Sequence, residues 1–87
     1  MGAYNYGHAA VYAMNEREFI SEVADIIETD SNSLSMASSF REESDFWSSL
    51  VGFALLTFME QECGTVISVD DFIACETIGD LYKKTRR

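Results

Sequence analysis

WSSLVGFALLTFMEQECG, residues 47–64, is the stretch that decides the fold. It opens on serines, which can cap a helix, and closes on Gly64, a residue typical of helix ends. The residues between them are apolar nearly all round until Glu60, so we predict a helix over residues 49–62. A helix that is apolar on every side is either buried or keeps a bare face for a partner. A chain of 87 residues is too small to bury it fully, which favours a partner.

The sequence does not explain why one position inside this helix is a glycine. Gly52 lies well inside the helix, where glycine costs about 1 kcal/mol relative to alanine. The sequence offers no contact that compensates for this cost, although close approach of another chain would do so.

The segment before this helix is predicted to hold another helix and a long loop. Asn15 and Glu18 form a capping-box pattern, and apolar residues then recur at helical spacing. Residues 30–48 follow and are rich in serine and acids. A loop this long in so small a domain is usually functional or packed by its own anchors, and we expect Phe40 and Trp47 to be those anchors.

The segment after the apolar helix is predicted to hold two short helices. Ser68 with Asp71, and Thr77 with Asp80, make capping patterns in front of apolar residues. The end of the last helix carries four of the six basic residues, where positive charge suits the helix dipole: Lys83, Lys84, Arg86 and Arg87. We therefore predict an all-α protein, a small four-helix bundle with a long loop between its first two helices.

The first residues of the chain differ from the rest. MGAYNYGHAAVYA, residues 1–13, has no charged side chain and no clear period. We interpret residues 1–13 as a flexible N-terminal extension or a remnant of cloning. The domain is then residues 14–87, with Met14 close to its start.

The charge of the chain is strongly acidic and unevenly distributed. Within residues 1–82 only Arg17 and Arg41 oppose all 15 acids, a formal charge of −13. Such a surface repels nucleic acid and anionic membranes and attracts basic protein surfaces; the alternative is a solvated face that only keeps the protein soluble. Neither a signal-peptide pattern nor a membrane-spanning apolar run occurs, so we expect a cytoplasmic monomer with no membrane span.

The residue types needed for catalysis are poorly represented. The only histidine, His8, lies in the N-terminal stretch, and no metal-ligand spacing or Gly-rich phosphate loop occurs. Asp70 and Asp71 are neighbours, which point about 100° apart on a helix and make a poor acid–base pair. We predict that the chain is not an enzyme, binds no metal, and packs its two cysteines as reduced, buried thiols: Cys63 and Cys75.

Three segments carry a resemblance to a known family: Phe40-Arg41, Trp47-Ser48-Ser49-Leu50 and Thr77-Ile78-Gly79-Asp80-Leu81-Tyr82. With them, residues 14–85 resemble the acyl carrier protein family, most of all its small discrete bacterial members. The family's attachment motif is Asp-Ser-Leu at the start of its second helix, and Ser49-Leu50 matches the Ser-Leu. Positions downstream of this motif align with the family's pattern without a gap: Glu60, Glu62, Gly64, Ile67, Asp70, Asp71, Thr77 and Ile78.

The resemblance implies a carrier protein. Ser49 would receive a covalent 4′-phosphopantetheine arm from a phosphopantetheinyl transferase, and the arm's thiol would hold an acyl group as a thioester. The modified Ser49 bears a phosphodiester anion, which the N-terminus of a helix favours. The implied partners are acyl-loading and acyl-transfer enzymes with basic or apolar docking patches, and such carriers serve fatty acyl, polyketide, aminoacyl and cell-surface precursor pathways.

The chain departs from the family's pattern at two places. Ser48 stands where the family usually has Asp; serine can still cap the helix, but the charge expected to help engage the transferase is lost. Register with Leu50 favours Ser49 over Ser48 as the attachment site. Val51 and Ala54 stand where the family usually carries acids that pair with basic enzyme surfaces.

We therefore expect partners to contact this helix through a more apolar surface than is usual. The residues expected at that contact are Leu50, Val51, Phe53, Thr57 and Glu60. The alternative is that Val51 and Phe53 simply pack on the long loop. An alternative function also stays open, an acidic helical protein-interaction module that is never modified.

Overall fold

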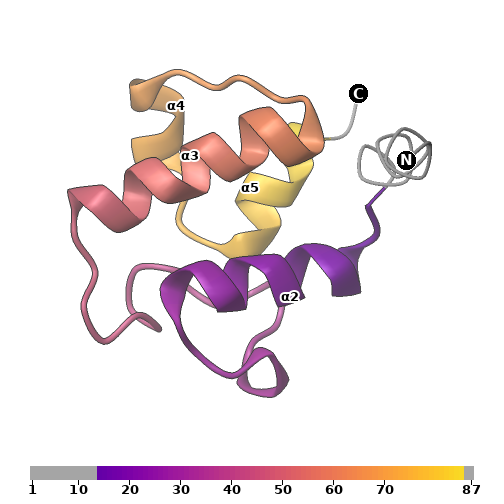
Figure 1. Cartoon of the computed structure of the whole chain (residues 1–87), viewed down its shortest axis with the longest axis vertical. Coiled ribbons are helices and arrows are strands. Elements are labelled where there is room, and N and C mark those ends of the chain that lie inside the picture. The colour runs from indigo at the N-terminus through magenta and orange to yellow at the C-terminus, as the bar shows by residue number, and fades with distance from the viewer. Residues whose placement is uncertain (1–13, 86–87) are drawn as a thin grey trace, which may run out of the picture.

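The structure is a computed structural model that describes residues 14–85; the proposed extension, residues 1–13, lies outside this part of the chain. Between residues 14 and 85 the chain forms four α-helices and one 3₁₀ turn and contains no β-strand (Figure 1). They are α2 (Glu16–Ile27), η1 (Ser31–Ser33), α3 (Ser49–Cys63), α4 (Val69–Ala74) and α5 (Ile78–Thr85). The prediction of an all-α domain of four helices is confirmed.

Side chains at the start of α2 hold it as its sequence predicts. The Glu18 backbone N–H donates to Asn15 Oδ1 at 2.8 Å, and the Asn15 N–H donates to Glu18 Oε1 at 3.0 Å. Both halves of the predicted capping box are therefore present and satisfy two backbone donors. Glu28 ends the helix in the left-handed conformation, with φ 57°.

The apolar helix α3 begins at Ser49 as predicted and ends one residue later than predicted. Ser48 is its N-cap, and its hydroxyl oxygen accepts from the Val51 N–H at 3.4 Å. Gly64 ends the helix in the left-handed conformation, with φ 67°, which glycine adopts at little cost.

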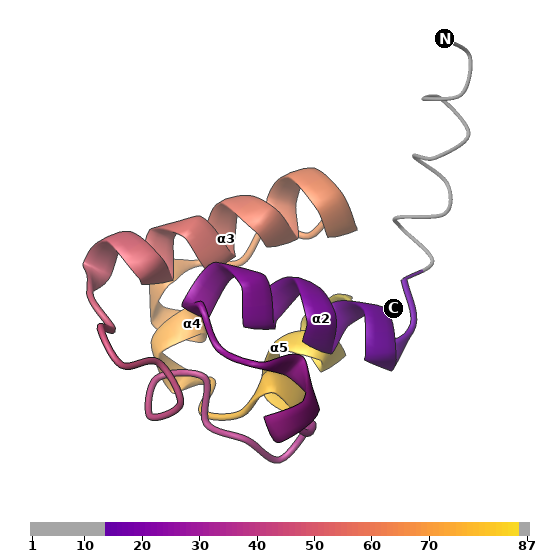
Figure 2. The same cartoon turned by 60° about the horizontal axis from the view of Figure 1, so that its bottom comes forward.

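The core lies where α2, α3 and α5 meet. α2 and α3 run side by side in opposite directions in Figure 2, and the Phe19 ring of α2 packs on Phe58 of α3 at 5.6 Å between centroids. The same ring meets Tyr82 of α5 at 5.2 Å. The largest side chains in this core are fully buried: Phe19, Phe40, Ile27, Leu55, Met59, Ile78, Leu81 and Val23.

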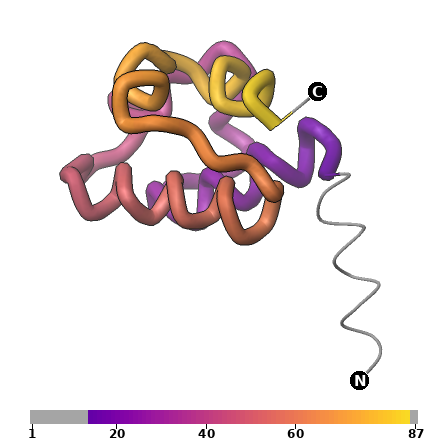
Figure 3. The backbone as a smooth tube through the Cα atoms, turned by 90° about the horizontal axis from the view of Figure 1, so that it is seen from above, coloured from indigo at the N-terminus to yellow at the C-terminus, as the bar shows by residue number. Residues whose placement is uncertain are grey.

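The long loop is tied to the opposite end of the sequence. The Ile78 N–H donates to the Ser38 carbonyl at 3.0 Å, and the Gly79 N–H donates to the Met36 carbonyl at 2.8 Å. A side-chain carbon at Gly79 would meet the Met36 carbonyl oxygen at 2.9 Å, so this approach requires glycine. Seen from above, α4 and α5 lie along one side of the molecule and α3 along the other (Figure 3).

None of the helices within residues 14–85 combines the length and the apolar character needed to cross a bilayer.

Candidate functional site

Ser49 occupies the first turn of α3 and is exposed to solvent. Its neighbour Ser48 uses its own hydroxyl as the cap, which leaves the Ser49 hydroxyl free of that role. The cap satisfies the N–H of Val51, whereas those of Ser49 and Leu50 have no acceptor within residues 14–85. An exposed hydroxyl beside unpaired N–H groups is a suitable place for a group that carries negative charge.

A groove opens next to Ser49, between α3 and α4. It encloses about 580 Å³. One wall belongs to α3, with Phe53 and Leu56, and the other belongs to α4, with Val69 and Ile73. The serines lie at the edge of this groove, so a group attached to Ser49 has apolar surface within its reach.

The side chains on the two walls are unusually exposed for apolar residues. The exposed fractions are 67% for Phe53, 62% for Val69 and 63% for Ile73, and Leu50 beside them is 79% exposed. Exposed apolar residues are common singly, but Phe53, Val69 and Ile73 line one groove, and Leu50 lies one helical turn before Phe53; such a cluster is typical of binding surfaces. We call Leu50, Phe53, Val69 and Ile73 the apolar patch.

An aromatic cluster, the aromatic floor, supports the groove and is formed by the two predicted anchors of the long loop and one residue of α4. Its Trp47 and Phe72 rings line the groove, whereas Phe40 is buried. The Phe40 ring packs on Trp47 at 5.7 Å and on Phe72 at 5.6 Å, and Trp47 stacks on Phe72 at 6.5 Å. Phe40 is completely buried and Trp47 is half-buried. The prediction that Phe40 and Trp47 anchor the loop is confirmed.

The same cluster explains why residue 52, inside α3, is a glycine. A side-chain carbon at Gly52 would lie 3.3 Å from the Trp47 ring and 3.4 Å from the Phe72 ring. The missing side chain lets the aromatic floor rest directly against α3. The compensation for Gly52 therefore comes from within this chain and not from a partner.

The residues predicted at the partner contact do not all lie on the surface. Leu50, Phe53 and Glu60 are exposed, whereas Val51 and Thr57 are half-buried, and Val51 packs on the core. Packing accounts for part of the Val51 side chain but not for Phe53, which stays 67% exposed.

Three residues of the site were missed at the level of sequence: Val69, Ile73 and Arg41. Val69 and Ile73 lie four residues apart on α4, next to Phe72 on the side of the helix that lines the groove. That spacing was a usable signal for an apolar stripe. The role of Arg41 depends on contacts more than 30 residues away and left no local signal.

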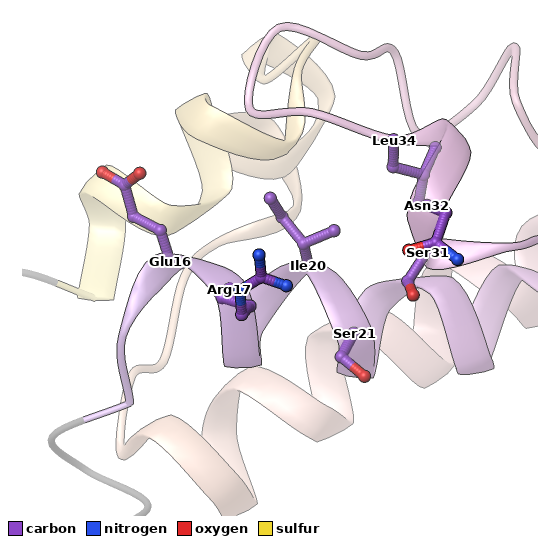
Figure 4. Close-up of a pocket in the computed structure, with 7 residues that line it drawn as sticks. All are labelled: Glu16, Arg17, Ile20, Ser21, Ser31, Asn32 and Leu34. Atoms are coloured by element: carbon purple, nitrogen blue, oxygen red, sulfur yellow. The ribbon is translucent and has the colours of Figure 1, made fainter.

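A second hollow, at the other side of the domain, has a different character. It encloses about 510 Å³ between α2 and the η1 turn, and Figure 4 shows the Arg17, Ser31 and Asn32 side chains around it. Only Ile20 and Leu34 give it an apolar base. Its residues bring together neither a nucleophile with a base nor an exposed apolar surface.

The two thiols are free and buried, as predicted. Burial, together with the carboxylates of Glu62 and Glu22, raises the pKa of Cys63 to about 11, and burial also raises the pKa of Cys75. Such thiols stay protonated at neutral pH and are poor nucleophiles. Within residues 14–85 no three histidine, cysteine, aspartate or glutamate side chains are grouped so as to hold a metal ion.

This chain was compared with protein-family models, curated proteins and solved structures, and it matches none of them.

Proposed function

We propose that this protein is a carrier of the acyl-carrier type, with a 4′-phosphopantetheine arm attached to Ser49. The observation that supports it best is the place of Ser49: an exposed hydroxyl at the tip of α3, at the edge of an apolar groove. A carrier needs its attachment point open to the transferase that modifies it and to the enzymes that use its cargo.

The residues around Ser49 fit the group that they would hold. A phosphodiester on the Ser49 oxygen lies beside the unpaired N–H groups of the first turn of α3, where negative charge is favoured. Ser48 keeps the first turn formed by accepting from Val51, so modification of Ser49 leaves the cap intact. The arm's terminal thiol would supply the thioester chemistry when it is bound.

The proposed partners are a phosphopantetheinyl transferase and enzymes that load or accept the acyl group. The apolar patch would form the centre of their contact, and exposed acids on α3 and α4 would form its rim: Glu60, Glu62, Asp70 and Asp71. Contacts with an apolar centre and a charged rim are common between proteins, and the rim charges steer a basic partner.

A second candidate function is an acidic interaction module that carries no arm. The apolar patch favours it, because a docking surface of four exposed side chains requires no modification at Ser49. Under this alternative, Ser48 and Ser49 would only begin the helix.

Co-expression with a broad-specificity phosphopantetheinyl transferase separates the two. The carrier function predicts that the intact mass rises by one phosphopantetheine, that Ser49→Ala abolishes the increase, and that Ser48→Ala retains it. An unchanged mass for the wild-type chain, under conditions that modify a known carrier in the same cells, would support the interaction module.

A further inference from the structure

Arg41 makes an unusual set of contacts for a residue of a long acidic loop. Its Nη1 donates to the Cys75 carbonyl at 2.6 Å, and its Nη2 donates to the Phe72 carbonyl at 3.1 Å. Both carbonyls belong to the C-terminal end of α4, where a helix carries partial negative charge, and the Phe72 carbonyl also accepts from the Cys75 N–H. Acids are abundant in the chain, yet this guanidinium binds backbone carbonyls.

The same guanidinium lies against all three rings of the groove floor. Its central carbon is 4.7 Å from the Phe40 centroid, 5.4 Å from Phe72 and 5.7 Å from Trp47. These distances are within the range of cation–π attraction. Arg41 therefore joins the loop, the aromatic floor and the end of α4 through one side chain.

Helix α4, whose end Arg41 contacts, is short and mostly exposed. α4 is six residues long, and isolated helices of this length are unstable in water. Phe72 is its only buried residue, while Val69, Ile73 and Ala74 are exposed. Besides the Ser68 cap at its start and the buried Cys75 at its end, the α4 wall of the groove depends on one buried ring and on Arg41.

We propose that Arg41 is a positioning residue of the candidate site, which fixes α4 against the aromatic floor and so sets the α4 wall of the groove beside Ser49. The use of that groove by cargo or partner rests on the proposed function, whereas the hold of Arg41 on α4 does not. Lysine cannot replace Arg41, because a single ammonium does not reach two carbonyls and present a flat face to the rings at once.

Arg17 provides a matched control. It is the only other arginine within residues 14–85, it lies on the exposed face of α2, and its side chain makes no hydrogen bond or ion pair within that range. Arg41→Gln and Arg17→Gln change the net charge equally. A difference between them therefore reports contacts and not charge.

Hydrogen exchange on the full, unmodified chain tests the proposal. In Arg41→Gln the amides of residues 72–75 are expected to exchange about tenfold faster or more, because two charge-assisted hydrogen bonds are lost while the core of α2 and α3 remains. Arg17→Gln should leave all amides unchanged, and Arg41→Lys should resemble Arg41→Gln. Faster exchange across the whole domain, or protection restored by lysine, would overturn the proposal.

Trp47 gives a second readout that a general loss of stability does not mimic. It is the only tryptophan of the chain, so the emission of the folded protein reports the groove floor alone. The emission of folded Arg41→Gln should shift to longer wavelength and be quenched more readily by acrylamide, with no change in Arg17→Gln. An unchanged spectrum in Arg41→Gln would contradict the proposal, whether or not Ser49 accepts an arm.

Discussion

Helices α2 and α3 are neighbours of similar length with different outward faces. α2 buries Phe19, Val23 and Ile27 and turns charged side chains to the solvent. α3 buries Leu55 and Met59 in the same core, but its first two turns present apolar side chains outward. The inward faces of α2 and α3 bury apolar side chains, and this burial stabilises the fold. The outward face of α3 leaves Leu50 and Phe53 exposed, and this is why we propose that the function lies there.

The largest effect on stability is expected when a buried side chain of α3 is shortened, and a much smaller effect when an exposed one is shortened. Leu55→Ala should lower the free energy of unfolding by about 2–5 kcal/mol, because Leu55 is fully buried and leaves a cavity. Phe53→Ala should change it by no more than about 0.5 kcal/mol, because Phe53 is mostly exposed. Chemical denaturation measures both. A loss of more than 1.5 kcal/mol in Phe53→Ala, well above the roughly 0.5 expected, would mean that this face serves the fold.

The outward face can also be tested through its partners. Under the proposed function, Phe53→Asp should slow acyl loading by the protein's own partner enzymes by about 10- to 100-fold, because a charge then occupies the centre of an apolar contact. Ser21→Asp adds the same charge on the exposed face of α2 and should leave loading unchanged. Steady-state loading rates on arm-bearing protein check this, and equal rates for the two variants would exclude the apolar patch as the contact.

The caps of the two helices should differ in strength. Asn15→Ala removes a capping box with bonds of 2.8 and 3.0 Å and should cost about 1–2 kcal/mol. Ser48→Ala removes a single bond of 3.4 Å and should cost about 0.5–1 kcal/mol. Thermal unfolding of both variants ranks the caps, and a larger loss for Ser48→Ala would show that Ser48 does more than cap.

The smallest effect is expected where α3 ends near α2. The pKa of Cys63 lies at about 11 in the folded protein and near the ordinary value of 9.0 when unfolded. The neutral thiol therefore stabilises the fold below pH 9, and this contribution is lost as the pH rises from 9 to 11. Denaturation at pH 8 and pH 11 should show a steeper loss for the wild type than for Cys63→Ala. Equal losses would mean that Cys63 is not desolvated.

Local signals account for what the sequence predicted well. Asn15 with Glu18, Ser48 and Gly64 are residues whose side chain or backbone freedom acts on the nearest turn. The start of α2, the start of α3 and, to within one residue, the end of α3 followed from them. The exposed hydroxyl at Ser49 was expected from the resemblance to the carrier family.

The groove could not be predicted in this way, because its parts are distant in the chain. Phe53 and Ile73 are 20 positions apart, and nothing local shows that α4 places Ile73 opposite Phe53. The reason for Gly52 depends likewise on where the Trp47 and Phe72 rings come to rest. These are consequences of tertiary packing, which the spacing of apolar residues along one helix does not contain.

The central claim, that Ser49 is a carrier serine, is tested most directly by locating the added mass. After co-expression with a phosphopantetheinyl transferase, the peptide that spans Trp47 to Glu60 is isolated and fragmented in a mass spectrometer. The account predicts one phosphopantetheine, carried by fragments that contain Ser49 and absent from those that end at Ser48. An unmodified peptide, or an arm on Ser48, would contradict it.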